Sequence, residues 1–207
     1  MRENVLKTIA ELKEKSKKRN FSQTIDLIVI LKEFDTKKSE NKFTEDVLLP
    51  KGRGKPANVV VFSDTVKDLD CEIINSSELE GLGKNKREAK RLAASTQFFL
   101  AEAPMMPLIG KSLGQFLAPR GKMPKIVAGN IAPLVKTLKN SVRIKVKDSP
   151  VIQCLVGKED MKDEDIEVNI DAVLHFLETK LPKGKHNIGE VLLKFTMSGP
   201  VKMVYEK

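Results

Sequence analysis

Apolar residues in the first quarter of the chain recur with a helical period and then in two short runs. Residues 1–18 carry one apolar stripe among Lys and Glu, which predicts an amphipathic helix. The stripe consists of Val5, Leu6, Ile9 and Leu12. The runs TIDLIVIL (24–31) and FTEDVLLP (43–50) predict two strands, and the polar turn between them predicts an antiparallel pair. A link rich in Gly, Pro and Lys, KGRGKP (51–56), follows.

From Asn58 the pattern changes to short apolar strands that alternate with helical stretches. The predicted strands are 58–62, 71–75 and 97–102, and the predicted helices are 84–95, 104–117 and 130–140. Such alternation implies right-handed crossovers and a small parallel sheet with helices on both faces. The middle of the chain is therefore predicted to be an α/β block.

After Ser141 the strands again alternate apolar and polar residues. The runs VRIKVKD (142–148) and VIQCLVG (151–157) predict an antiparallel pair across the turn Ser149-Pro150. A helix follows, and its apolar stripe is Ile166, Ile170, Val173, Leu174, Leu177 and Leu181. A last strand over 190–206 is interrupted by TMSGP (196–200).

Neither flank of the α/β block has enough elements for a domain by itself. We therefore predict a discontinuous α+β domain, an antiparallel sheet with helices built from 1–55 and 142–207, with 56–141 inserted into it. The chain would cross the boundary near 55 and near 141, which suits a hinge.

Composition fits two folded domains and a polyanionic partner. The 207 residues are 41% hydrophobic and 31% charged, which excludes a disordered chain. Lys and Arg outnumber Asp and Glu by 37 to 28, giving a net charge of +9 that would attract nucleic acid. A basic protein without a nucleic-acid partner remains an alternative. One Tyr and no Trp argue against a broad aromatic platform for single strands.

The residue types that carry catalysis or bind metals are not arranged as sites. Cys71 and Cys154 are far apart and lie in apolar runs, so we expect buried thiols in a reducing cytoplasm and no metal site. His175 and His186 have no clustered partner. The N-terminus lacks the apolar core of a signal peptide or a membrane span.

One short segment resembles a nucleotide site. Gly110-Lys111-Ser112 matches the end of a phosphate-binding P-loop, but the glycine that should precede it is Met105. A nucleotide-binding α/β enzyme is therefore kept only as the alternative function, and we expect no enzyme and no cofactor.

Four basic or small-residue segments are candidates for contact with nucleic acid. KEKSKKRNF (13–21) brings Arg19 and Phe21 to the start of a strand, and KNKREAKR (84–91) is more typical of a solvated helix face. RGKMPK (120–125) is a rigid loop that would touch phosphate or simply connect a helix to a strand. The hydroxyl, thioether and bare backbone of TMSGP suit contact with riboses and base faces.

These segments carry a resemblance over essentially the whole chain. NFSQTID (20–26), LPKGRGK (49–55), LAPRGKMP (117–124) and TMSGPVK (196–202) resemble, in order and spacing, the ribosomal L-one family in its shorter archaeal form. The resemblance implies a terminal α+β domain with an inserted Rossmann-like three-layer domain. It also implies a lateral-stalk protein of the large ribosomal subunit, in the cytoplasm.

The resemblance further implies the partners. These are a folded element of large-subunit ribosomal RNA, exit-site tRNA and the protein's own mRNA, whose translation it would repress. No membrane partner is expected, and the free protein would be a monomer.

The site residues follow from the matched motifs and their charge. The expected RNA-binding residues are Arg19, Phe21, Thr24, Asp26, Lys158, Thr196, Met197, Ser198 and Gly199. The expected secondary contacts to RNA or tRNA are Arg120, Lys122 and Lys125. The chain departs from the family pattern in reading Thr-Met-Ser-Gly for Thr-Met-Gly and in having Asn20 before the Phe, where Arg19 would substitute.

Overall fold

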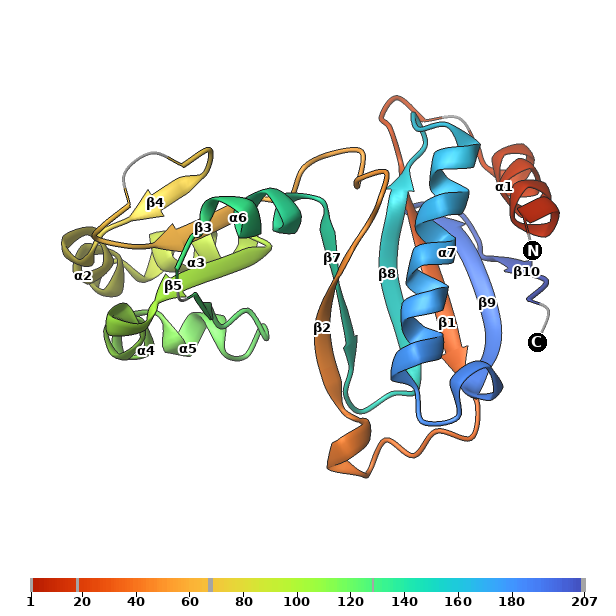
Figure 1. Cartoon of the computed structure of the whole chain (residues 1–207). Helices are drawn as coiled ribbons and strands as arrows, with labels where there is room; N and C mark the ends of the chain where they lie inside the picture. Colours follow the sequence, from red (N-terminus) through yellow and green to blue (C-terminus); the bar gives the residue numbers. More distant parts are fainter. Residues whose placement is uncertain (1, 18, 67–68, 128, 206–207) are drawn as a thin grey trace. The chain divides into compact units, whose positions relative to one another are not determined.

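The computed structural model describes residues 2–17, 19–66, 69–127 and 129–205 (Figure 1). The chain divides into two compact units, Met1–Lys55 with Asn140–Lys207, and Pro56–Lys139. We call them the discontinuous unit and the middle unit. Three residues within the predicted elements, Met1, Lys18 and Glu206, lie outside the described residues.

A four-stranded antiparallel sheet forms the centre of the discontinuous unit. Its order is β10 (Val201–Met203), β9 (Ile188–Phe195), β1 (Thr24–Leu31) and β8 (Val151–Lys158). Alternate residues of β1 are buried, as expected for a strand with one face toward a core.

Two helices cover that core face. They are α1 (Arg2–Lys15) and α7 (Asp163–Lys180), and the predicted apolar stripe of α7 is buried throughout, which confirms that prediction. The short η3 (Gly184–Asn187) leads from α7 toward β9.

The two predicted strand pairs of this unit are wrong in their partners, although the strands exist. β2 (Phe43–Leu48), which follows η1 (Ser39–Asn41), pairs with β7 (Ser141–Val146), while β1 lies between β8 and β9. The turn at Ser149-Pro150 carries the chain from one sheet to the other, and Leu31 N donates to Pro150 O at 2.8 Å. The rule that neighbouring strands pair therefore fails, because the long apolar β1 takes the central position between two distant strands.

The β2–β7 pair is joined by an ion pair as well as by its backbone. Arg143 and Asp46 face each other in register, and the guanidinium donates through Nε at 2.7 Å and through Nη2 at 3.3 Å to the two carboxylate oxygens. Asp46 has only 4% of its side chain exposed, so the pair is largely shielded from water.

The predicted last strand is two strands joined by a turn. β9 ends at Phe195, residues 196–200 reverse the chain, and β10 returns antiparallel along β9. TMSGP is therefore the tip of a hairpin and not a break within one strand.

The middle unit is a parallel sheet with helices on both faces. Its order is β4 (Glu72–Ile74), β3 (Val59–Phe62), β5 (Phe98–Glu102) and β6 (Lys125–Val127). One face packs on α2 (Ser76–Lys84), α3 (Lys86–Ser95), α4 (Met106–Ser112) and α5 (Gly114–Leu117), and the other on α6 (Ala132–Lys139). The sequence did not predict α2 or β6, and the predicted helix over 104–117 is divided into η2 (Ala103–Met105), α4 and α5.

Candidate nucleic-acid interface

Most of the predicted RNA-binding residues of the discontinuous unit meet at one end of its sheet. Thr24, at the start of β1, pairs with Lys158 of β8 on one side. On the other side the Thr196 amide donates to Thr24 O at 3.1 Å, and the Thr24 amide donates to Thr196 Oγ1 at 3.3 Å. We call the group Phe21, Thr24, Lys158, Thr196 and Met197 the sheet-end surface.

A β-bulge decides the direction of Lys158. The register of β1 and β8 shifts between Ile25 and Asp26, and both Val156 and Gly157 are buried. Without the extra residue, strict alternation would place Lys158 on the buried face. Glycine suits position 157, since an added Cβ would lie 3.2 Å from Met161 Sδ and 3.3 Å from Ile166 Cγ1, closer than most Cβ contacts.

Ser198 shapes the hairpin tip that presents Met197. The Phe195 amide donates to Ser198 Oγ at 2.9 Å, and the Ser198 amide donates to Phe195 O at 3.1 Å. This turn leaves Met197 60% exposed. An added Cβ at Gly199 would meet no atom within 4 Å, so nothing in the described chain needs a glycine there.

A buried amide, which the sequence reasoning missed, ties three segments together beneath this surface. Gln23 is 2% exposed, and its Oε1 accepts from the Met197 amide at 3.3 Å. Its backbone amide donates to Glu159 Oε2 at 3.3 Å, and its carbonyl accepts from the Glu159 amide at 2.9 Å. In the sequence, only the position of Gln23 between Phe21 and Thr24 could have indicated that it belongs to this site.

Two predicted residues in the segment that leads to β1 are open to solvent. Arg19 is exposed, and Phe21 has 55% of its surface exposed. An exposed aromatic ring beside a cation is typical of surfaces that stack on bases.

Asp26 lies on the outer face of the sheet and faces a lysine. It is in register with Lys194 of β9, a residue that the sequence reasoning also missed. Partial burial raises the pKa of the Asp26 carboxyl, and the charge of Lys194 opposes that rise. The carboxylate of Asp26 and the ammonium of Lys194 therefore lie on neighbouring strands of the same face, where opposite charges attract.

The three predicted secondary residues differ in their surroundings. Lys122 Nζ donates to Ala93 O at 2.9 Å and to Thr96 O at 2.6 Å, which places its charge at the C-terminal end of α3. Arg120 Nη1 donates to Phe116 O at 3.2 Å, and Lys125 is exposed at the start of β6. Lys122 thus contributes to a helix terminus, where cations are favoured.

Comparison with known proteins agrees with this arrangement. The model of the Ribosomal protein L1p/L10e family matches residues 12–199, which is 188 of the 207 residues (199 − 12 + 1). The chain belongs to this family.

Three archaeal relatives of the L1p/L10e chain match over nearly their whole length. Each is a large ribosomal subunit protein uL1. That of Methanobrevibacter smithii is 44% identical over 99% of this chain and 100% of its own. That of Methanocaldococcus jannaschii is 44% identical, over 100% and 97%, and that of Pyrococcus horikoshii is 42% identical, over 98% and 96%. The resemblance stated from four short motifs is confirmed.

The P-loop-like segment of this L1p/L10e member is helical. Gly110, Lys111 and Ser112 lie inside α4, so their amides are not arranged as a loop around a phosphate. Among the described residues, no group of three or more His, Cys, Asp and Glu could hold a metal ion. No helix in the described ranges is long and apolar enough to cross a membrane.

The two thiols differ in access. Cys154 is buried in the core of the discontinuous unit, and burial raises its pKa to about 12. Cys71 is half-buried in the middle unit.

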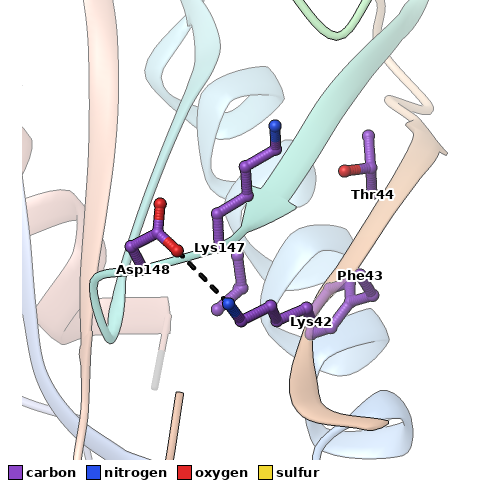
Figure 2. Close-up of a pocket in the computed structure, with 6 residues that line it drawn as sticks. Lys42, Phe43, Thr44, Lys147 and Asp148 are labelled. Carbon is purple, nitrogen blue, oxygen red and sulfur yellow. Dashed lines mark hydrogen bonds and ion pairs between the residues drawn. The ribbon is translucent and has the colours of Figure 1, made fainter. Parts of the chain in front are cut away.

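One pocket lies at the opposite end of the discontinuous unit from the sheet-end surface (Figures 1 and 2). It has a volume of about 380 Å³ and is lined by Lys42, Phe43, Thr44, Val146, Lys147 and Asp148. Lys42 Nζ lies 3.3 Å from Asp148 Oδ1, so one of its two cations is already paired. The site is shallow and lies between the start of β2 and the end of β7.

Proposed function

We propose that this chain is an RNA-binding protein of the large ribosomal subunit, and that its discontinuous unit carries the main RNA site. The supporting observation is the sheet-end surface, which joins an exposed thioether, an exposed aromatic ring, a hydroxyl and a cation on a rigid sheet. The names of the relatives supply the ribosomal assignment.

The chemistry of the surface suits folded RNA. Lys158, Lys194 and Arg19 offer cations to phosphates and fix the orientation of the RNA. Phe21 and Met197 offer apolar contact to unstacked bases, and Thr196 offers a hydroxyl to a ribose 2′-OH. Because the hydrogen bonds of Gln23 and Ser198 hold this surface in place, little order needs to be gained on binding.

The finer proposal follows the family resemblance. The protein forms the mobile stalk beside the tRNA exit site, and the middle unit, through Arg120 and Lys125, makes a secondary contact to RNA or tRNA. The same sheet-end surface binds a similar element in the protein's own mRNA and represses its translation. The protein is monomeric when free, works in the cytoplasm and catalyses no reaction.

The test measures binding of the full chain to the large-subunit rRNA of Methanobrevibacter smithii, with small-subunit rRNA as competitor. We expect preference for the large-subunit transcript and a loss of more than tenfold in affinity for Thr196→Val and for Met197→Asp. Val204→Asp is the matched control, because Val204 is 63% exposed against 60% for Met197. Unchanged dissociation constants for well-folded variants would sink the proposal.

The alternative function has its own check. Equilibrium dialysis with ATP and with NAD should show no specific binding, whereas a nucleotide-binding enzyme would retain one of them. The mRNA proposal is checked by adding the protein to a cell-free translation reaction that is programmed with its own transcript.

A further inference from the structure

Arg53 has two buried guanidinium nitrogens that are unpaired in the described part of the chain. Arg53 is half-buried in the link between β2 and the middle unit. Its Nε and Nη1 are buried and have no hydrogen-bond partner among the described residues. Burial lowers the pKa of this guanidinium, which nevertheless stays charged because an arginine side chain does not lose its proton in proteins.

The link is held in place by one side chain of α7. Asn169, which is fully buried, accepts from the Lys51 amide at 3.0 Å and donates to Gly52 O at 2.8 Å. The same amide group also donates to Val156 O of β8 at 2.8 Å. The link is therefore fixed against the end of β8, beside the bulge that directs Lys158.

Gly54, the residue after Arg53, lies against a residue of the sheet-end surface. Gly54 has φ +78°, and an added Cβ would lie 3.0 Å from Cβ and Cγ of Lys158. Lys158 thus contacts the link on one side and pairs with Thr24 on the other. In Figure 1 the link, the start of β1 and the end of β8 lie at the same end of this unit.

The neighbouring cation of the link is neutralised and Arg53 is not. Lys51 Nζ lies 3.4 Å from Asp165 Oδ1. A desolvated guanidinium without an anion is unfavourable, so the site gains when an anion supplies the missing charge. A phosphate can reach this planar, always charged group through Nη2, the one guanidinium nitrogen that is not among the buried unpaired atoms.

We propose that Arg53 and Lys158 together bind a phosphate of the RNA backbone, which extends the RNA site from the sheet-end surface onto the link. This inference rests on the proposed function and deepens it. RNA contact at the link would fix the point where the chain leaves the discontinuous unit.

The test removes the charge of Arg53 and keeps the length of its aliphatic side chain. Arg53→Met should lower the affinity of the full chain for the large-subunit rRNA transcript about tenfold, and it should reduce the slope of log K against log salt by about 1. Arg53→Lys should keep the slope and lose affinity several-fold, because a flexible ammonium does not take the place of the planar guanidinium. Arg87→Met, at an exposed position of α3, is the matched control and should change neither.

The melting temperature of Arg53→Met distinguishes an RNA contact from a purely structural role of Arg53. Arg53→Met should melt at the same temperature as the parent or higher, since it removes an unpaired buried charge. A lower melting temperature with unchanged affinity and slope would overturn the inference.

Two further comparisons distinguish failure of the Arg53 inference from failure of the proposed function. If Arg53→Met binds rRNA normally while Met197→Asp does not, the inference fails and the proposed function stands. If the parent shows no preference for the large-subunit transcript, the proposed function itself fails. Isothermal titration with inorganic phosphate covers a free anion: Arg53-dependent phosphate binding with unchanged rRNA affinity would assign the site to free phosphate and overturn the RNA contact.

Discussion

At the residue scale, polar side chains with little exposure fix the positions of the exposed side chains. Met197 and Phe21 are the groups that protrude, but Ser198 closes the turn and Gln23 holds the Met197 amide from below. The motifs of the sequence marked the exposed residues well. Gln23 escaped notice because a polar residue before a strand reads as part of a loop until its burial is known.

Removing the buried acceptor tests this support. Gln23→Leu leaves the Met197 amide without its partner and should lower affinity for the large-subunit rRNA five- to tenfold, corresponding to about 1–1.4 kcal/mol. Filter binding measures the change, and Gln153→Leu, at an exposed position of β8, is the control. Equal affinities for the two variants would show that the turn holds its shape without Gln23.

At the element scale, local patterns predicted strands and helices but not their partners. Periodicity gave β1, β2, β8 and α7, because each buries its own face. The pairings of β1 with β8 and β9 depend on which strand takes the centre of the sheet, and that choice is made by contacts across more than 100 residues. The bulge at Val156–Gly157 could not be predicted either, because a bulge exists only relative to the strand with which it pairs.

In the loop RGKMPK, the charge of Lys122 is used within the middle unit, at the C-terminal end of α3. Lys122→Met removes two hydrogen bonds to the end of α3 and should lower the free energy of unfolding of the middle unit by about 1–2 kcal/mol. Affinity for rRNA should change less than twofold. Hydrogen exchange at the last amides of α3 gives the readout, with Lys90→Met on the exposed side of the same helix as control. If hydrogen exchange of α3 is unchanged and rRNA binding is weaker, Lys122 contacts the RNA and does not stabilise α3.

At the scale of the whole molecule, the two crossings of the chain lie side by side at each unit. In the discontinuous unit the Leu49 amide donates to Asn140 O at 3.1 Å, and in the middle unit the Ala57 amide donates to Lys139 O at 2.8 Å. The change in the sequence pattern near 55 and 141 pointed to such a division.

These neighbouring crossings allow the middle unit to be removed. A chain in which a short Gly-Ser linker replaces residues 56–139 should fold, because the ends to be joined are adjacent and the core of the discontinuous unit is separate. We expect it to keep most of the affinity for large-subunit rRNA. A well-folded product with more than tenfold weaker binding would move the main site to the middle unit.

The unequal burial of the two thiols makes the natural chain suitable for optical measurement. A maleimide dye should react at Cys71 and leave Cys154 untouched, because only an accessible thiolate reacts readily. A single dye would then report from the middle unit without any substitution. Paired with a second dye on a bound rRNA transcript, it would report the distance between the middle unit and that RNA.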